Sequence, residues 1–128
     1  MTDRLPRPTY AELSILRVLW ERGPSTVREV HDALSSTQAT GYTTVLKLMQ
    51  IMTEKRLVVR DESQRAHVYE ARHSEQRTQR QIVADLVERA FGGSSAKLVM
   101  QALSGRKASA AELSEIRELL DRLEGDKR

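Results

Sequence analysis

The chain contains no cysteine and few aromatic residues. Its 128 residues include 39% hydrophobic side chains but only 4% aromatic ones. Disulfides, thiolate metal sites and cysteine nucleophiles are therefore excluded, and the core must consist mainly of Leu, Val, Ile, Met and Ala. Such a lean core in a chain of this length suits one domain, or one small domain with an appendage.

Long hydrophobic runs are also missing. No stretch approaches the roughly 20 apolar residues that a membrane helix needs, so we expect no membrane insertion. The first four residues, Met1–Arg4, are polar and lack the apolar centre of a signal peptide. We therefore expect a cytoplasmic protein.

The residue patterns that mark enzymes are absent as well. His31, His67 and His73 show no metal-ligand spacing, and no serine lies in the glycine-flanked motif of a hydrolase nucleophile. Gly92-Gly93 fits a helix stop better than a phosphate cradle. The sequence thus predicts a protein that is not an enzyme and uses no cofactor or metal.

The charge is only mildly positive, with 21 Lys and Arg against 18 Asp and Glu. The whole-chain balance therefore argues weakly for a nucleic-acid partner. The segment 35–60 is more basic than the rest, with Lys47, Lys55, Arg56 and Arg60 against the single acidic residue Glu54. A nucleic-acid-binding face is expected in this segment.

Three capping boxes predict where helices begin. In each, a Ser or Thr is followed three residues later by Glu, so that each side chain can bond the other's backbone N–H. The pairs are Thr9 with Glu12, Thr26 with Glu29, and Ser109 with Glu112.

A further helix is predicted over about 41–55. Its core stripe follows the i, i+3, i+4, i+7 pattern of an amphipathic helix, with Val45, Leu48, Met49 and Met52. The opposite face carries small or polar side chains, among them Thr43 and Lys47, with Leu46 on the flank.

Two β-type runs, 57–60 and 66–69, follow this helix and are separated by the polar turn 61–65. A helix followed directly by a small hairpin is the outline of a winged helix-turn-helix, which places the helix in a DNA groove and the hairpin against the backbone. We predict a mostly α protein with a small β-hairpin wing over about 57–71 (α+β). The winged-helix DNA-binding domain would span 1–73.

Residues 74–128 are expected to form three helices, and such a unit rarely buries enough surface to be stable alone. Pairing with a second copy would make this the dimerisation domain, and a two-fold dimer predicts an inverted-repeat DNA site. The alternative is a monomer whose tail folds back on the N-terminal core. The predicted dimerisation residues are Ile82, Leu86, Leu98, Leu113, Ile116, Leu120 and Leu123.

The start of the 41–55 helix supplies the predicted base contacts. Thr43 and Thr44 can bond base edges or pack on a thymine methyl group, and Lys47 can reach guanine or a phosphate. Tyr42 would stack or bond at the backbone, or else belong to the core. Leu46 would touch a thymine methyl group, or likewise be core.

Four further residues are candidates for backbone contacts. Arg28, near a helix N-terminus that favours anions, would clamp a phosphate, or else form a surface ion pair. Arg60, Arg65 and His67 in the wing would touch backbone or minor groove, and the alternative is that they are simply solvated. Phosphate contacts of this kind position a protein without reading sequence.

Five segments, in this order and spacing, resemble one known family over about residues 9–123. They are 19–30 (Leu-Trp-Glu-Arg-Gly-Pro-Ser-Thr-Val-Arg-Glu-Val), 42–45, 65–69, 91–94 and 112–120. The chain resembles the penicillinase-repressor and methicillin-resistance-repressor family, which includes copper-responsive repressors. The resemblance implies a homodimeric winged-helix repressor of palindromic operators, often with TACA/TGTA-type half-sites. It also implies control of a β-lactam or cell-envelope response.

In relatives, a membrane sensor protease responds to β-lactams and cuts an Asn–Phe bond in the C-terminal domain. The matching position here is Gln101-Ala102, which makes it the candidate proteolytic switch. The copper-responsive branch carries a C-terminal cysteine cluster that this chain lacks. The family often has Arg at the position of Ile51 and a basic residue at that of Thr43, so base preference is expected to differ.

A second hypothesis remains, since fold alone does not fix function. Some winged helices bind another protein instead of DNA, and the near-neutral overall charge is compatible with that role. A winged-helix interaction module is therefore the alternative to a DNA-binding repressor.

Overall fold

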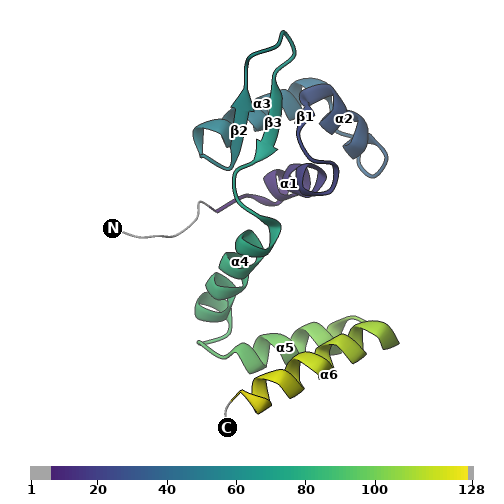
Figure 1. The fold of residues 1–128 in the computed structure, drawn as a ribbon, viewed down its shortest axis with the longest axis vertical. Coiled ribbons are helices and arrows are strands. Elements are labelled where there is room, and N and C mark those ends of the chain that lie inside the picture. Colours follow the sequence, from purple (N-terminus) through teal and green to yellow (C-terminus); the bar gives the residue numbers. More distant parts are fainter. Residues whose placement is uncertain (1–6, 127–128) are drawn as a thin grey trace. The chain divides into compact units, whose positions relative to one another are not determined.

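The computed structural model describes residues 7–126. Within them lie six helices and three strands (Figure 1). In chain order these are α1 (Tyr10–Arg22), β1 (Ser25–Thr26), α2 (Val27–Ser35), α3 (Tyr42–Glu54), β2 (Val58–Asp61), β3 (Val68–Ala71), α4 (Glu75–Ala90), α5 (Ser95–Gly105) and α6 (Ala110–Gly125). The predicted fold class, mostly α with a small β wing, is confirmed.

The chain divides into two compact units, Met1–Ala84 and Asp85–Arg128. The division falls inside α4, so the first turns of that helix belong to the unit that contains the sheet. No helix within residues 7–126 is both long and apolar enough to cross a membrane.

All three predicted capping boxes are present. At α1, the Thr9 hydroxyl accepts the Glu12 N–H at 3.2 Å, while Glu12 Oε1 accepts the Thr9 N–H at 2.8 Å. The same reciprocal pair closes the N-terminus of α2 through Thr26 and that of α6 through Ser109. Because a capping box involves residues only three apart, these helix starts could be predicted from local sequence.

The wing belongs to a three-stranded antiparallel sheet in the order β1-β3-β2. The hairpin pairs Val58 with Ala71 and Arg60 with Tyr69. Its strands begin one or two residues later than the predicted runs. Strand β1 was not predicted, because its two residues sit in the segment that also caps α2 and show no alternating pattern.

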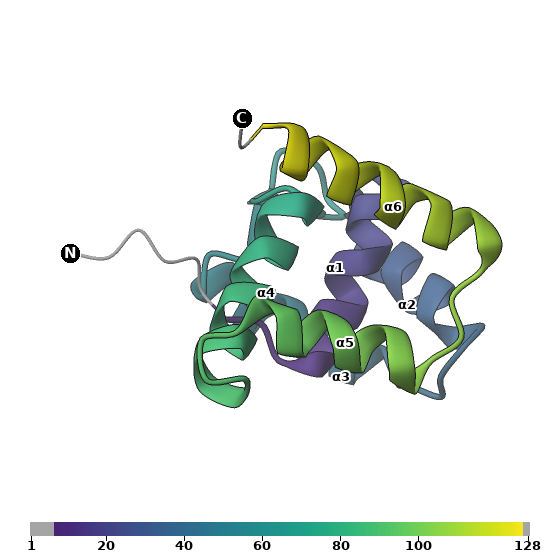
Figure 2. The same cartoon turned by 90° about the horizontal axis from the view of Figure 1, so that it is seen from below.

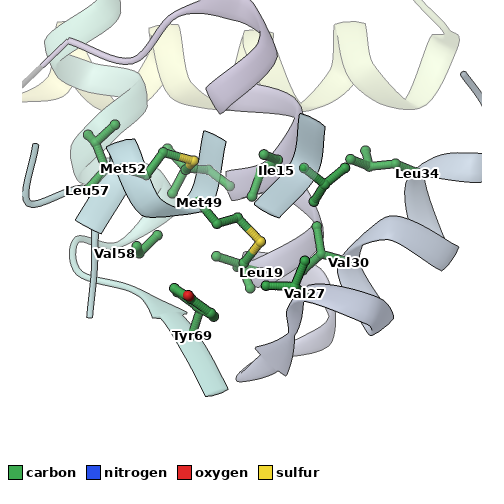
Figure 3. Close-up of a cluster of buried hydrophobic side chains, with 12 residues drawn as sticks. Ile15, Leu19, Val27, Val30, Leu34, Met49, Met52, Leu57, Val58 and Tyr69 are labelled. Atoms are coloured by element: carbon green, nitrogen blue, oxygen red, sulfur yellow. The ribbon is translucent and has the colours of Figure 1, made fainter. Parts of the chain in front are cut away.

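The core of the first unit lies between α1, α2 and α3 on one side and the hairpin on the other (Figure 3). Of the predicted stripe on α3, Val45, Met49 and Met52 are fully buried, whereas Leu48 is only partly buried. Tyr69 of β3 is the residue of the sheet's middle strand that packs in this cluster. These contacts fix the rotation of α3 about its own axis.

The turn from α3 into the wing has a left-handed residue, Arg56, at φ 63°. The Leu57 N–H donates to the Met52 carbonyl at 2.9 Å, and the Arg56 N–H donates to that of Thr53 at 3.2 Å. This pair of bonds is the Schellman motif, which usually has glycine at the left-handed position. The motif ends α3 and aims the chain into β2.

The second unit, unlike the first, leaves most of its apolar side chains exposed to solvent. Helices α5 and α6 diverge from the loop that joins them (Figure 2), and neither helix contains a buried residue. Apolar side chains on this unit are therefore largely open to solvent, for example Met100 at 63% and Leu120 at 52% exposed.

Candidate nucleic-acid interface

The outer face of α3 carries the predicted base contacts. Thr43, Thr44 and Lys47 are all exposed, because the buried stripe through Val45 and Met49 turns the other side of the helix to solvent. Thr43 and Thr44 have short hydroxyl side chains, and Lys47 beside them is the one long cation. The backbone of α3 is therefore accessible to the edge of a DNA groove. The residues that can read base edges thus stand together on one accessible helix face.

A groove beside this face joins α2, α3 and the wing. Its volume is about 400 Å³. Five of the predicted contact residues line it: Arg28, Tyr42, Leu46, Arg65 and His67. Since they come from three separate elements, the fold gathers what the sequence shows only as scattered candidates. Thr26, Val27, Ala66 and Tyr69 complete the lining.

Tyr42, the first residue of α3, is held by two side chains of α2. The Arg28 guanidinium carbon lies 5.0 Å from the centre of the Tyr42 ring. The His31 ring meets the same ring edge-on, with centroids 5.9 Å apart and an interplanar angle of 71°. Sequence reasoning missed His31 as part of the site, although residues three apart on a helix share a face and Arg28 was a candidate.

Arg60 is engaged by other groups of the wing. Its Nε donates to Glu62 Oε2 at 2.9 Å. A hydrogen bond to Tyr69, together with the Glu62 carboxylate, raises the pKa of Arg60 above its ordinary range. The guanidinium is therefore partly committed to the hairpin, whereas Arg65 at the wing tip is exposed.

Lys55, which contributed to the basic character of segment 35–60, also has a partner. Its Nζ lies 2.6 Å from Glu12 Oε1, and the Glu12 side chain is only 3% exposed. The positive charge that this segment can offer to a polyanion is thus smaller than the sequence count indicates. It rests mainly on Lys47 and the exposed Arg56.

The predicted dimerisation residues lie in the helices of the tail. They are half-buried at Ile82, Leu98, Leu113 and Ile116 and more open at Leu86, Leu120 and Leu123, which are 45%, 52% and 50% exposed. Gln101 and Ala102 are exposed and lie within the helix α5.

Within residues 7–126 no three His, Asp or Glu side chains come together in a group that could hold an ion.

Helices α1 to α3 and the three-stranded sheet, with an exposed polar outer face on α3, define a winged-helix domain, the class of many transcriptional regulators. The sequence profile of the penicillinase repressor family matches residues 8–122. The chain belongs to the penicillinase repressor family and is a transcriptional repressor, not an enzyme.

The chain is also similar to a curated relative and, in fold, to a solved structure. The chain is 31% identical over 122 residues to the transcriptional regulator BlaI of Mycobacterium tuberculosis, which covers 94% of this chain and 88% of the relative. It is similar in fold to the solution structure of the DNA-binding domain of the repressor BlaI, with a TM-score of 0.51 and 23% identity. That similarity covers 58% of this chain and 90% of the other.

Proposed function

We propose that this repressor acts as a homodimer that binds an inverted-repeat operator in double-stranded DNA. The observation that carries the proposal is the exposed face of α3 beside the groove lined by Arg28, Tyr42 and Arg65. A helix of this kind enters the major groove while the wing lies along the backbone.

Within this proposal the contact residues divide by task. Thr43, Thr44 and Lys47 face base edges. Arg65 and His67 of the wing, with Arg28 of α2, face phosphates and hold the domain in register. Tyr42 contacts the sugar-phosphate backbone, and Leu46 contacts a thymine methyl group.

Arg60 has a smaller share in the proposed interface. Its guanidinium already bonds Glu62, so it keeps this contact and adds only part of its positive charge near the turn of the wing.

The proposed domains are 1–73 for DNA binding and 74–128 for dimerisation. Support for the second assignment comes from the apolar side chains that α5 and α6 leave exposed, such as Val99, Met100 and Leu119. A second copy of the chain would cover them. Two-fold symmetry then sets two recognition helices on half-sites separated by whole helical turns, roughly 34 Å each.

A β-lactam or cell-envelope response, released by a membrane sensor protease, is the regulation proposed from family membership. The candidate bond Gln101-Ala102 lies inside α5. Proteolytic nicking favours exposed loops over helices, so cleavage here requires α5 to unwind locally.

Selection from a random duplex library tests the proposal. The purified chain is incubated with the library at moderate salt, and the retained duplexes are sequenced. Enrichment of an inverted repeat, with affinity that falls steeply with salt, is the expected result. A folded, dimeric protein that enriches no sequence would contradict the proposal and favour the protein-interaction module.

A further inference from the structure

The C-terminal end of α3 is tied to the N-terminal end of α1 by one partly buried ion pair. Lys55 Nζ donates to Glu12 Oε1 at 2.6 Å across 43 residues of sequence. The Glu12 side chain is 3% exposed and that of Lys55 33%. A carboxylate this deeply buried is tolerated only where a cation and hydrogen bonds compensate the lost hydration.

The two charges also suit the helix ends on which they stand. Glu12 lies in the first turn of α1, where backbone N–H groups favour a negative charge, and Lys55 is the C-cap of α3, where carbonyl groups favour a positive one. The same Glu12 oxygen accepts the Thr9 N–H of the capping box. One atom therefore joins the start of α1 to the end of α3.

Lys55 occupies the point where the recognition helix passes into the wing. Arg56, the next residue, has the left-handed backbone that turns the chain toward β2, and Leu57 enters the core. A shift of Lys55 relative to α1 would therefore move both DNA-facing elements, the exposed face of α3 and the hairpin.

We propose that Glu12 and Lys55 are positioning residues that set the placement of α3 and the wing relative to α1, and through it the discrimination between operator and other DNA. The inference rests on the proposed operator binding. Glu12 cannot touch DNA, because its side chain is buried; its effect on binding is transmitted through Lys55.

A competing role for Lys55 makes an opposite prediction. If Lys55 were a phosphate contact that Glu12 partly neutralises, removal of the Glu12 charge would strengthen binding to every duplex. Loss of Lys55 would then make the negative slope of log K against log salt less steep by about 0.9. A positioning role predicts weaker operator binding in Glu12→Gln and an unchanged salt slope in Lys55→Gln.

The first measurement is the affinity of Glu12→Gln for the selected operator and for an unrelated duplex. Gln keeps the capping box, which accepts Glu or Gln, but removes the ion pair. The ratio of operator to unrelated affinity should fall roughly tenfold, a typical effect for residues that act through others. Arg22→Met, which breaks the exposed 3.5 Å pair between Arg22 and Glu29, is the matched control and should leave the ratio unchanged.

The second measurement needs no DNA and so separates this inference from the proposed function. Amide hydrogen exchange of the free, full-length protein should accelerate about tenfold over 51–61 in Glu12→Gln and remain unchanged over α2. If the wild-type protein selects no operator, the proposed function fails. The hydrogen-exchange measurement still tests whether the ion pair holds α3 in place.

Lys55→Gln is the second variant and should reproduce both effects. An unchanged affinity ratio with unchanged exchange would overturn the proposal, as would tighter binding to all duplexes. If both variants fail to fold, the pair serves stability alone and the proposal is equally overturned.

Discussion

At the scale of single residues, the proposed DNA interface depends on which cations are available to a polyanion. Lys47 and Arg65 are exposed, whereas Arg60 bonds Glu62 and Lys55 bonds the buried Glu12. Similar side chains in one short segment therefore have different tasks. Substitutions at these positions should therefore differ both in which property of DNA binding they change and in how large the change is.

Lys47→Ala and Arg65→Ala provide this comparison. Lys47→Ala should cost about 1–3 kcal/mol of operator binding and relax base preference at one position of each half-site. Arg65→Ala should weaken binding to all duplexes alike and lower the salt slope by about 1. Titrations of operator and unrelated duplex at several salt concentrations measure both effects. Equal losses of operator and unrelated binding in Lys47→Ala would mean that α3 does not read the bases.

His73 should give the stability of the first unit a pH dependence. Its backbone carbonyl accepts the Trp20 indole N–H at 2.9 Å, and burial, with Arg77 and Arg72 nearby, lowers the pKa of its imidazole below the ordinary 6.5. The unfolded chain then takes up the proton at a higher pH than the folded one. The free energy of unfolding should therefore decrease as pH falls through about 6.5 and below.

Urea unfolding from about pH 8 to 5, followed by Trp20 fluorescence, measures this dependence. His73→Gln should flatten the acid side of the curve, because Gln does not titrate. A variant with the same decrease as the wild type would assign the pH dependence to other groups.

At the scale of elements, the link between α3 and β2 is strained. Arg56 adopts φ 63° inside a Schellman motif, a conformation that costs an L-residue roughly 1–2 kcal/mol. Glycine has no such penalty but loses more backbone freedom on folding, by about 0.5–1 kcal/mol. The structure therefore retains a cation in a place where glycine is the more stable choice.

Arg56→Gly should raise the free energy of unfolding by about 0.75 kcal/mol, the difference between the midpoints of these two effects. The exposed Arg56 side chain also adds charge near the wing, so the same variant should lower the salt slope of DNA binding. Chemical denaturation and salt titrations measure the two results. Arg56→Ala is the control: it removes the charge, keeps the strain and should not gain stability.

At the scale of the whole molecule, the two units differ in how they bury apolar surface. The first has a continuous core of fully buried side chains, among them Ile15, Val30 and Met49. Helices α5 and α6 bury no residue. Exposed apolar surface of this kind is typical of interaction sites, and a second copy is the partner that the repressor proposal requires.

Leu120→Glu should disrupt such a dimer, because it places a charge among exposed apolar side chains of α6. We expect the dimer dissociation constant to rise at least about tenfold. Operator affinity should fall with it, while the first unit keeps its stability. Sedimentation equilibrium measures the association. Ser114→Glu introduces the same side chain on the opposite side of α6 and should leave the dimer intact; equal association in both variants would contradict the assigned interface.

Local sequence by itself determined several features of this protein. The capping boxes at Thr9, Thr26 and Ser109 fixed helix starts, and the stripe through Val45 and Met52 fixed which face of α3 is exposed. These signals depend on residues three to seven positions apart, a range over which helix geometry is set in advance. The order of helix and hairpin followed from the same patterns.

Only the tertiary structure decided how distant residues are partnered. Strand β1 exists because Ser25 and Thr26 meet β3, Tyr42 contacts Arg28 and His31 because α2 packs beside α3, and Lys55 reaches Glu12 across 43 residues. No periodic pattern records such contacts, since each depends on how whole elements pack together. Packing therefore determined which of the predicted cations remain available at the proposed DNA interface and which are held within the fold.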